Sequence, residues 1–200
     1  MQQMRFVLID IDTQKDYVEH FGAAAIPDCP VIRENLMELM SFAIRNKLPI
    51  LSLIRSENDG EICKKNSPEW EKVLDTECEK QVWISESLQE LQSLSKEPTD
   101  WQQILLEHSG DKPSEVNGLE QTLAQLEPTH LIVFGVPLES TVIAILDLLL
   151  KNTTYKIWLV RDAVKGYQDE NATLEQLRGR ENLSLMSARN VLKFLSELRY

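Results

Sequence analysis

The stretch from Thr129 to Ala144 constrains the fold more than any other part of the sequence. It begins with a run of large apolar residues (131–134), is interrupted by Gly135 and Pro137, and then continues as a longer apolar run. A buried strand, a turn and a helix in this order are typical of one unit of a parallel sheet. The sequence therefore predicts a strand at 131–134 and a helix from about Glu139 to Leu150.

The turn after this strand is a candidate site for chemistry. In open α/β sheets, ligands bind beyond the carboxyl ends of the strands, where the following helix presents unpaired N–H groups and a partial positive charge. Ser140 and Thr141 fall in the first turn of the predicted helix, so their hydroxyl groups face such a site. Alternatively, they are only N-terminal cap residues, because Ser and Thr are preferred there.

Strands and helices alternate along the rest of the chain. Apolar runs predict strands at 5–12, 48–54, 155–160 and 183–186, and helical spacing predicts helices at 31–46, 118–126 and 187–198. This alternation implies a parallel sheet covered on both faces by helices, with right-handed crossovers. A length of 200 residues with 42% apolar content suits a single domain that spans the whole chain.

The segment from Ser56 to Lys112 differs in character. It holds fourteen acidic and six basic residues, and so carries -8 of the net charge of -11. Weak periodicity predicts amphipathic helices near 68–73, 85–94 and 99–107. We interpret residues 56–110 as an acidic helical insertion or lid over one edge of the sheet; alternatively, the charges form a solvated face.

Charge and composition exclude several classes of partner. The net charge of -11 and the isoelectric point near 4.8 argue against nucleic acid or an anionic membrane surface. Cys29, Cys63 and Cys78 form no CxxC pair, so neither a disulfide framework nor a zinc site is predicted. No apolar run reaches the roughly 18 residues of a membrane helix, and no signal-peptide pattern is present. We therefore expect a cytoplasmic protein.

Two aspartates lie at the end of the first predicted strand. In a regular strand, Asp10 and Asp12 share one face, with their carboxylates roughly 7 Å apart. A buried carboxylate is costly unless it is paired or functional. Asp12 lies at the edge where ligands bind, whereas we expect Asp10 to be hydrogen-bonded or paired with a cation.

The first strand and three later segments together resemble a known family. LIDIDTQKDYV, with Asp12, Gln14 and Asp16, is similar to the Asp-x-Gln-x-Asp pattern of the isochorismatase-like hydrolases, also called the cysteine hydrolase superfamily. GDKPSEVNGLEQTL resembles the segment that supplies the family's lysine, here Lys112. FGVPLESTVIAILDLLL resembles its Gly-Val-x-x-Asp-x-Cys-Val turn and helix, and LVRDAV resembles the strand that follows. The resemblance covers nearly the whole chain and implies a Rossmann-like three-layer α/β sandwich with a mostly parallel six-stranded sheet.

The resemblance also implies a catalytic site, with one departure from the family pattern. Amidase members, nicotinamidases among them, use an Asp, a Lys and a Cys whose thiolate attacks a carbonyl. By position, Asp12 matches the acid and Lys112 the lysine, but Thr141 stands in place of the cysteine. His108 takes the place of Lys112 if the alignment shifts by a deletion. Because a threonine hydroxyl has a far higher pKa than a thiol, this departure argues against cysteine-type hydrolysis.

A second reaction of the family does not need the cysteine. Isochorismatases also lack it, and the resemblance implies that their aspartate protonates a vinyl ether directly. Burial and the nearby Asp10 carboxylate would help Asp12 to keep the proton that this reaction needs. Against this interpretation, those members carry an aromatic residue and a His in the turn, where this chain has Pro137 and Glu139.

The same resemblance gives the expected substrate contacts and cofactors. The substrate-binding candidates are Gln14, Val136, Pro137 and Ser140. The family has a cis peptide in the turn, and an X-Pro bond makes the cis form less costly, so we predict that Val136-Pro137 is cis. We expect no cofactor and no metal, because metal-dependent nicotinamidases present an Asp and two His after the second strand, where RSENDGEI has no histidine.

Two hypotheses about function follow. The first is a hydrolase that acts on a small amide or vinyl-ether substrate with Asp12, Lys112 and Thr141. The second is a catalytically inactive relative, a pseudoenzyme, that serves in small-molecule binding or protein assembly. Loss of the cysteine favours the second, and retention of Asp12 and Lys112 favours the first. From the resemblance we also expect a homo-oligomer, either a dimer or a tetramer.

Overall fold

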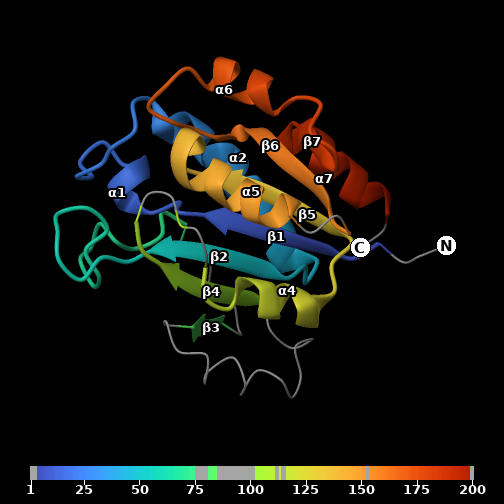
Figure 1. Cartoon of the computed structure of the whole chain (residues 1–200), viewed down its shortest axis with the longest axis horizontal. Helices are drawn as coiled ribbons and strands as arrows, with labels where there is room; N and C mark the ends of the chain where they lie inside the picture. The colour runs from blue at the N-terminus through green and yellow to red at the C-terminus, as the bar shows by residue number, and fades with distance from the viewer. Residues whose placement is uncertain are drawn as a thin grey trace.

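The sheet of this protein is wholly parallel. The computed structural model describes residues 4–74, 81–84, 102–110, 113, 116–151 and 154–198. The strands are β1 (Phe6–Ile11), β2 (Ile50–Arg55), β3 (Gln81–Ile84), β4 (Gln103–His108), β5 (His130–Gly135), β6 (Lys156–Val164) and β7 (Leu183–Met186). Their order is β3-β4-β2-β1-β5-β6-β7, and each neighbouring pair is parallel (Figure 1). β1 therefore lies at the centre.

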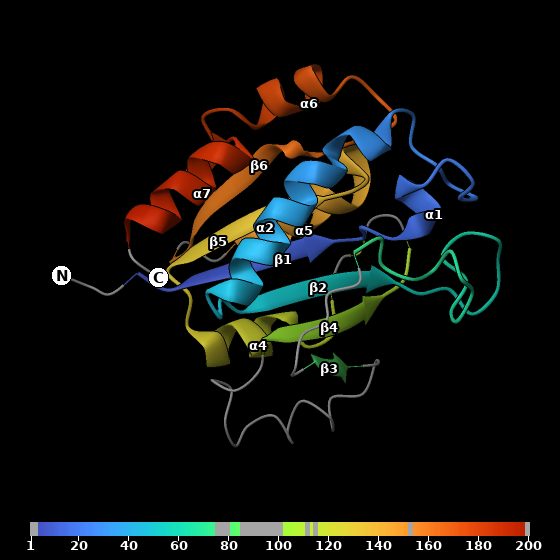
Figure 2. The same ribbon diagram turned by 180° about the vertical axis from the view of Figure 1, so that it is seen from behind.

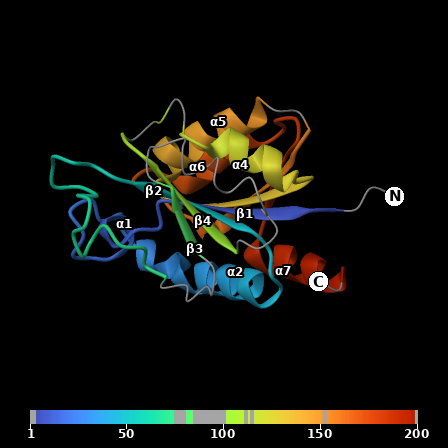
Figure 3. The ribbon, with the colours of Figure 1, turned by 90° about the horizontal axis from the view of Figure 1, so that it is seen from below.

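Helices cover both faces of the sheet. They are α1 (Lys15–Val18), α2 (Arg33–Arg45), α4 (Leu119–Leu126), α5 (Ile143–Leu150), α6 (Glu170–Leu177) and α7 (Ala188–Glu197), with a 3-10 helix at Cys29–Ile32 and a π-helix at Leu138–Val142. α4, α5 and α6 lie over one face, and α2 and α7 lie over the other (Figure 3). Figure 2 shows the second face, on which α2 crosses the central strands.

The two faces have separate apolar cores because the side chains of the strands alternate. Val7, Ile9 and Ile11 of β1 pack into the core beneath α4, α5 and α6. Phe6 and Leu8 of the same strand pack into the core beneath α2 and α7. A strand that is apolar on both faces belongs in the middle of such a sandwich, which explains the central position of β1.

The predicted three-layer α/β class is confirmed, and so are most of its elements. The predicted strands at 5–12, 48–54, 131–134, 155–160 and 183–186 correspond to β1, β2, β5, β6 and β7. The helices predicted at 31–46, 118–126 and 187–198 are also present, and Ser187 caps α7 by accepting a hydrogen bond from the Asn190 N–H. An edge strand, β3, lies beside the six others.

The helix predicted near 99–107 is wrong, because Gln103–His108 forms the buried strand β4. Its polar residues suggested the solvated side of a helix, but they have partners inside the protein. The Gln103 amide donates to Ser52 Oγ at 2.9 Å, and Glu107 forms a 2.7 Å ion pair with Lys65. Pairing of this kind lets a strand carry polar residues into a core.

The helix predicted near 68–73 is also wrong. These residues form turns and bends, and their backbone hydrogen-bonds to the loop after β1. The Lys15 N–H donates to Glu71 O at 2.9 Å, and the Val73 N–H donates to Thr13 O at 2.8 Å. The third predicted helix, 85–94, lies outside the described residues. The insertion or lid at 56–110 stays a prediction.

The turn after β5 has the predicted form. The Val136-Pro137 peptide is cis, as predicted. Gly135 has a φ of 130°, which favours glycine, and the Val136 N–H donates to Ile11 O at 2.9 Å. The π-helix and α5 follow directly. Within the described part of the chain, no helix combines the length and the apolar character that a membrane span requires.

Candidate functional site

Asp12 follows β1 at the carboxyl edge of the sheet, but it does not share a face with Asp10 as predicted. Its φ of 47° places it in the left-handed region, so the regular alternation of β1 ends before it. Asp12 contacts His108, which follows Ile104 and Leu106 on the α4 and α5 side of β4. Asp10 instead contacts Ser52, on the opposite side. The two carboxylates therefore belong to separate clusters.

Asp10 is paired with a cation, as predicted. Its Oδ2 lies 2.8 Å from Nζ of Lys72, and the Asp10 side chain is only 2% exposed. The hydroxyl of Thr13 donates to Oδ1 at 2.8 Å, and that of Ser52 donates to Oδ2 at 2.9 Å. Because Thr13 directly follows Asp12, this cluster also anchors the turn that carries Asp12.

Asp12 and His108 form the central contact of the site. Asp12 Oδ1 lies 2.8 Å from His108 Nε2, and the two side chains are 0% and 1% exposed. They come from the ends of β1 and β4, two strands separated in the sheet by β2. The other carboxylate oxygen, Asp12 Oδ2, is buried and has no hydrogen-bond partner among the described residues. A buried, unpartnered carboxylate oxygen is able to accept a proton from a bound molecule.

The charge of Asp12 determines the protonation of His108. Burial lowers the pKa of the imidazole, but the charge of Asp12 and the hydrogen bond between them outweigh burial and raise the pKa above its ordinary value. This shift favours the protonated imidazole, and the contact is then an ion pair. Shifted pKa values cluster at functional sites, so the pair of Asp12 and His108 marks this edge of the sheet as a candidate site.

Lys112, the predicted lysine of the site, lies outside the described residues. The structure instead brings its alternative, His108, into contact with Asp12. His108 ends β4, four positions before Lys112, and its imidazole supplies a positive charge at the aspartate. The role of Lys112 stays a prediction.

Thr141 is fully buried in the π-helix that follows β5. Because β5 pairs with β1, the turn that carries Thr141 and the turn that carries Asp12 leave the sheet at neighbouring positions. Ser140 is half-buried in the same helix. These positions agree with a hydroxyl group at the site. The catalytic role of Thr141 stays a prediction.

The amide of Gln14 is fully engaged with the backbone. It accepts a hydrogen bond from the Arg55 N–H at 2.9 Å and donates to Arg55 O and Trp70 O at 3.0 and 2.7 Å. Gln14 thus holds the end of β2 and the 69–73 segment against the loop after β1. Its contact with a substrate stays a prediction, as do those of Val136 and Pro137.

Neither described cysteine has the character of a nucleophile. Burial raises the pKa of Cys29 to about 12, and burial together with the charge of Asp12 raises the pKa of Cys63 to about 12. Both thiols are therefore neutral at physiological pH. Cys78 lies outside the described residues.

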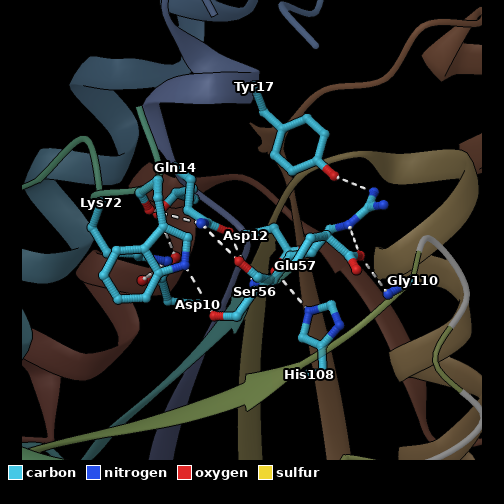
Figure 4. Close-up of polar contacts among 12 residues, drawn as sticks. Asp10, Asp12, Gln14, Tyr17, Ser56, Glu57, Lys72, His108 and Gly110 are labelled. Atoms are coloured by element: carbon cyan, nitrogen blue, oxygen red, sulfur yellow. Dashed lines mark hydrogen bonds and ion pairs between the residues drawn. The ribbon is translucent and has the colours of Figure 1, made fainter. Parts of the chain in front are cut away.

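Sequence analysis missed the residues that surround the pair. Figure 4 shows Tyr17, Ser56 and Glu57 around Asp12 and His108. Tyr17 and Glu57 are joined by Arg55, whose guanidinium donates to the Tyr17 hydroxyl and to Glu57 Oε1, each at 2.8 Å. The only signal in the sequence was that Arg55 and its neighbours directly follow a predicted strand at the edge where ligands bind. Among the described residues, no group of three or more His, Cys, Asp or Glu is placed to hold a metal.

Comparison with known proteins identifies the fold. No protein-family model and no curated protein sequence matches the chain. An isochorismatase family protein from Desulfovibrio vulgaris is 14% identical with a TM-score of 0.74, and the match covers 97% of this chain and 100% of that one. The nicotinamidase from Bacillus subtilis is 15% identical with a TM-score of 0.72, over 92% of this chain and 100% of that one.

A third structure extends the likeness to another amidase. N-carbamoylsarcosine amidase from Thermoplasma acidophilum is 17% identical with a TM-score of 0.67, and the match covers 92% of this chain and 97% of that one. The TM-scores and coverages of these three structures establish a common fold over nearly the full length of each protein. The chain has the fold of the isochorismatase-like hydrolases.

Proposed function

We propose that this protein is a hydrolase of small amide or vinyl-ether substrates, in which Asp12 transfers protons and His108 is its paired cation. The observation that carries the proposal is the 2.8 Å contact between Asp12 Oδ1 and His108 Nε2 at the carboxyl edge of the sheet. The unpartnered Asp12 Oδ2 leaves one oxygen of the pair for a substrate. The fold supports the same class of reaction, because solved structures that share it include a nicotinamidase and an N-carbamoylsarcosine amidase.

In the amide reaction, Thr141 Oγ1 attacks the carbonyl carbon while Asp12 accepts the hydroxyl proton. Asp12 then gives this proton to the leaving nitrogen, the C–N bond breaks, and an ester remains on Thr141. A water molecule attacks the ester and gives its proton to Asp12, which returns it to the departing hydroxyl of Thr141. His108 keeps its positive charge throughout and holds Asp12 in place.

In the vinyl-ether reaction, Asp12 begins as the acid and gives its proton to the terminal carbon. Water adds to the resulting cation and returns a proton to Asp12, and the hemiketal then separates into a carbonyl compound and an alcohol. This reaction requires Asp12 to begin as an acid. The isochorismatases of the family resemblance carry an aromatic residue and a His in the turn, where this chain has Pro137 and Glu139, which favours the amide reaction.

The second candidate function is binding or assembly without catalysis. Two observations favour it: Thr141 stands where the family resemblance expects a cysteine, and Asp12, His108 and Thr141 are all buried. A threonine hydroxyl is a poor nucleophile unless a base activates it strongly. Assembly into a dimer or tetramer and a cytoplasmic location also stay proposals.

A panel of small amides, nicotinamide and isochorismate separates the two candidates. The native protein is expected to hydrolyse at least one amide, and Asp12→Asn is expected to lower the rate at least about 100-fold, because the proton acceptor is lost. Asp59→Asn is the matched control, since Asp59 is exposed. Its rate should equal that of the native protein.

Thr141→Cys completes the experiment. Turnover by this variant alone would show an intact but silenced site and would support the inactive relative. Absence of turnover in both proteins would contradict the hydrolase proposal and support binding or assembly. Native turnover that survives Asp12→Asn would contradict the part assigned to Asp12.

A further inference from the structure

The carboxylate of Glu57 joins the ends of β2 and β4 beside the candidate site. Its Oε1 accepts hydrogen bonds from Arg55 Nε at 2.8 Å and from the Gly110 N–H at 2.9 Å. Arg55 ends β2, and Gly110 lies two positions after His108. Figure 4 shows Glu57 on the same side of the site as the turn that contains Gly110. Glu57 is thus bound to the turn that directly continues from His108.

The residue before Glu57 holds His108 itself. The Ser56 N–H donates to the backbone oxygen of His108 at 2.8 Å, and the Trp70 indole N–H donates to Ser56 Oγ at 2.9 Å. Ser56 therefore fixes the backbone of His108, and Glu57 fixes the turn that follows. Gly110 has a φ of 76°, and a Cβ added there would meet no atom within 4 Å, so the space beside Gly110 is open. The hydrogen bond that the Gly110 N–H donates to Glu57 Oε1 restrains Gly110.

Glu57 also belongs to the charges that act on His108. Asp12 at the end of β1 and Arg55 at the end of β2 shift the pKa of His108, and the positive charge of His108 in turn lowers the pKa of Glu57, so the charges of Glu57 and His108 attract each other. Arg55 opposes the positive charge of His108, whereas Asp12 favours it. Partial burial disfavours the charged form of Glu57, but the Gly110 N–H and Arg55 outweigh burial and lower its pKa, and the charge of His108 adds to this effect. Glu57 is therefore an anion that offsets Arg55 next to the imidazole.

We propose that Glu57 is a positioning residue of the candidate site: its carboxylate fixes Gly110 in the segment after His108 and, by offsetting Arg55, supports the positive charge that Asp12 favours on the imidazole. The inference rests on the proposed function, in which the positive charge of His108 holds Asp12 in place. A purely structural clasp would make the same hydrogen bonds but would not change the protonation of His108. The titration of the His108 ring distinguishes the two.

The experiment measures the ionisation midpoint of His108 by NMR of the histidine-labelled full-length protein. Glu57→Gln keeps an oxygen that accepts from Arg55 and Gly110 but removes the charge. Its His108 midpoint is expected to fall by about half a pH unit or more relative to the native protein. Glu34→Gln is the matched control, since Glu34 is exposed on α2, on the opposite face of the sheet from His108. Its midpoint should equal the native one.

A second variant separates the effect of the negative charge from the effect of side-chain length. Glu57→Asp keeps the negative charge but is one methylene shorter, so the contact with Gly110 is lost. Its His108 midpoint should stay closer to the native value than that of Glu57→Gln, while amide exchange at Gly110 should become faster. A native-like spectrum of Glu57→Gln with an unchanged His108 midpoint would overturn the inference.

The titration does not depend on turnover. A shifted midpoint in a protein that hydrolyses nothing would uphold the part assigned to Glu57 and contradict the proposed function. An unchanged midpoint in an active enzyme would do the opposite. The two proposals therefore fail separately.

Discussion

At the level of single residues, the cation beside Asp12 in the proposed site is the imidazole of His108. The family resemblance implies a lysine, whose charge is permanent at physiological pH, whereas a histidine titrates within the physiological range. The charge of Asp12 outweighs the effect of burial and raises the pKa of His108, which favours the charged imidazole. The site should therefore respond to pH in a way that a site with a lysine would not.

The first prediction concerns stability. The pKa of His108 is raised in the folded protein, so the pair stabilises the fold fully below the unfolded pKa near 6.5, and this stabilisation is lost as the pH rises through the folded pKa. The free energy of unfolding of the native protein, minus that of His108→Gln, should therefore decrease as the pH rises above about 6.5. Urea unfolding at several pH values measures it. A difference that is constant or grows with pH would contradict the ion pair.

The second prediction concerns activity. If the native protein hydrolyses an amide, its rate should fall on the alkaline side as His108 loses its proton. His108→Lys keeps the positive charge to a higher pH, so its alkaline limit should move upward by about one pH unit or more. A pH–rate profile of both proteins measures this. Identical alkaline limits would show that the charge of His108 does not matter for turnover.

At the level of elements, local sequence predicted those whose pattern is carried by apolar residues and breakers. β5 and the following turn are an example, because the apolar run, Gly135 and Pro137 are adjacent in sequence. β4 could not be found in this way. The polar groups of Gln103 and Glu107 are paired with Ser52 and Lys65, which are 51 and 42 positions away in sequence. A local sequence pattern cannot predict such distant partners.

The third prediction tests the buried position of β4. Leu106 is fully buried in the core beneath α4 and α5, so Leu106→Ala should lower the free energy of unfolding by about 2–5 kcal/mol. Met37→Ala is the control, because Met37 is 52% exposed on α2, and its effect should stay within about 0.5 kcal/mol. Chemical denaturation gives both values. Similar small effects would contradict a buried β4.

The fourth prediction tests the contact between the turn after β5 and the end of β1. A Cβ at Gly135 would lie 2.0 Å from Ile11 O, a backbone atom that cannot move alone. Gly135→Ala should therefore lower the free energy of unfolding by at least about 2 kcal/mol. At Gly166 a Cβ would meet the flexible end of Glu139 instead, so Gly166→Ala should cost less. Thermal unfolding compares the two, and the reverse order would contradict this packing.

At the level of the whole molecule, the sheet order brings the site together. β1 lies between β2 and β5. On one side of Asp12 is the end of β2, with Arg55 and Glu57. On the other side is the π-helix after β5, which contains Thr141. Sequence analysis predicted that Asp12 and Thr141 lie at this edge, because both follow recognisable strands. It left His108 and Lys112 open as the cation of the site, because the contact of His108 with Asp12 depends on where β4 ends.

The conformation of Asp12 shows a second limit of sequence analysis. The period of a regular strand placed Asp10 and Asp12 on one face, but the left-handed φ of Asp12 turns its carboxylate toward His108. That φ depends on contacts from other segments, including the hydrogen bond from the Asp12 N–H to Leu53 O at 3.0 Å. Such contacts appear only when the strands are assembled.

The most direct test of the central claim is the ionisation midpoint of His108 in the native protein and in Asp12→Asn. If the two side chains form the buried ion pair described above, the native midpoint lies above about 6.5 and falls in Asp12→Asn, because the anion that holds the proton is gone. A native midpoint at or below that value, or the same midpoint in both proteins, would contradict the account.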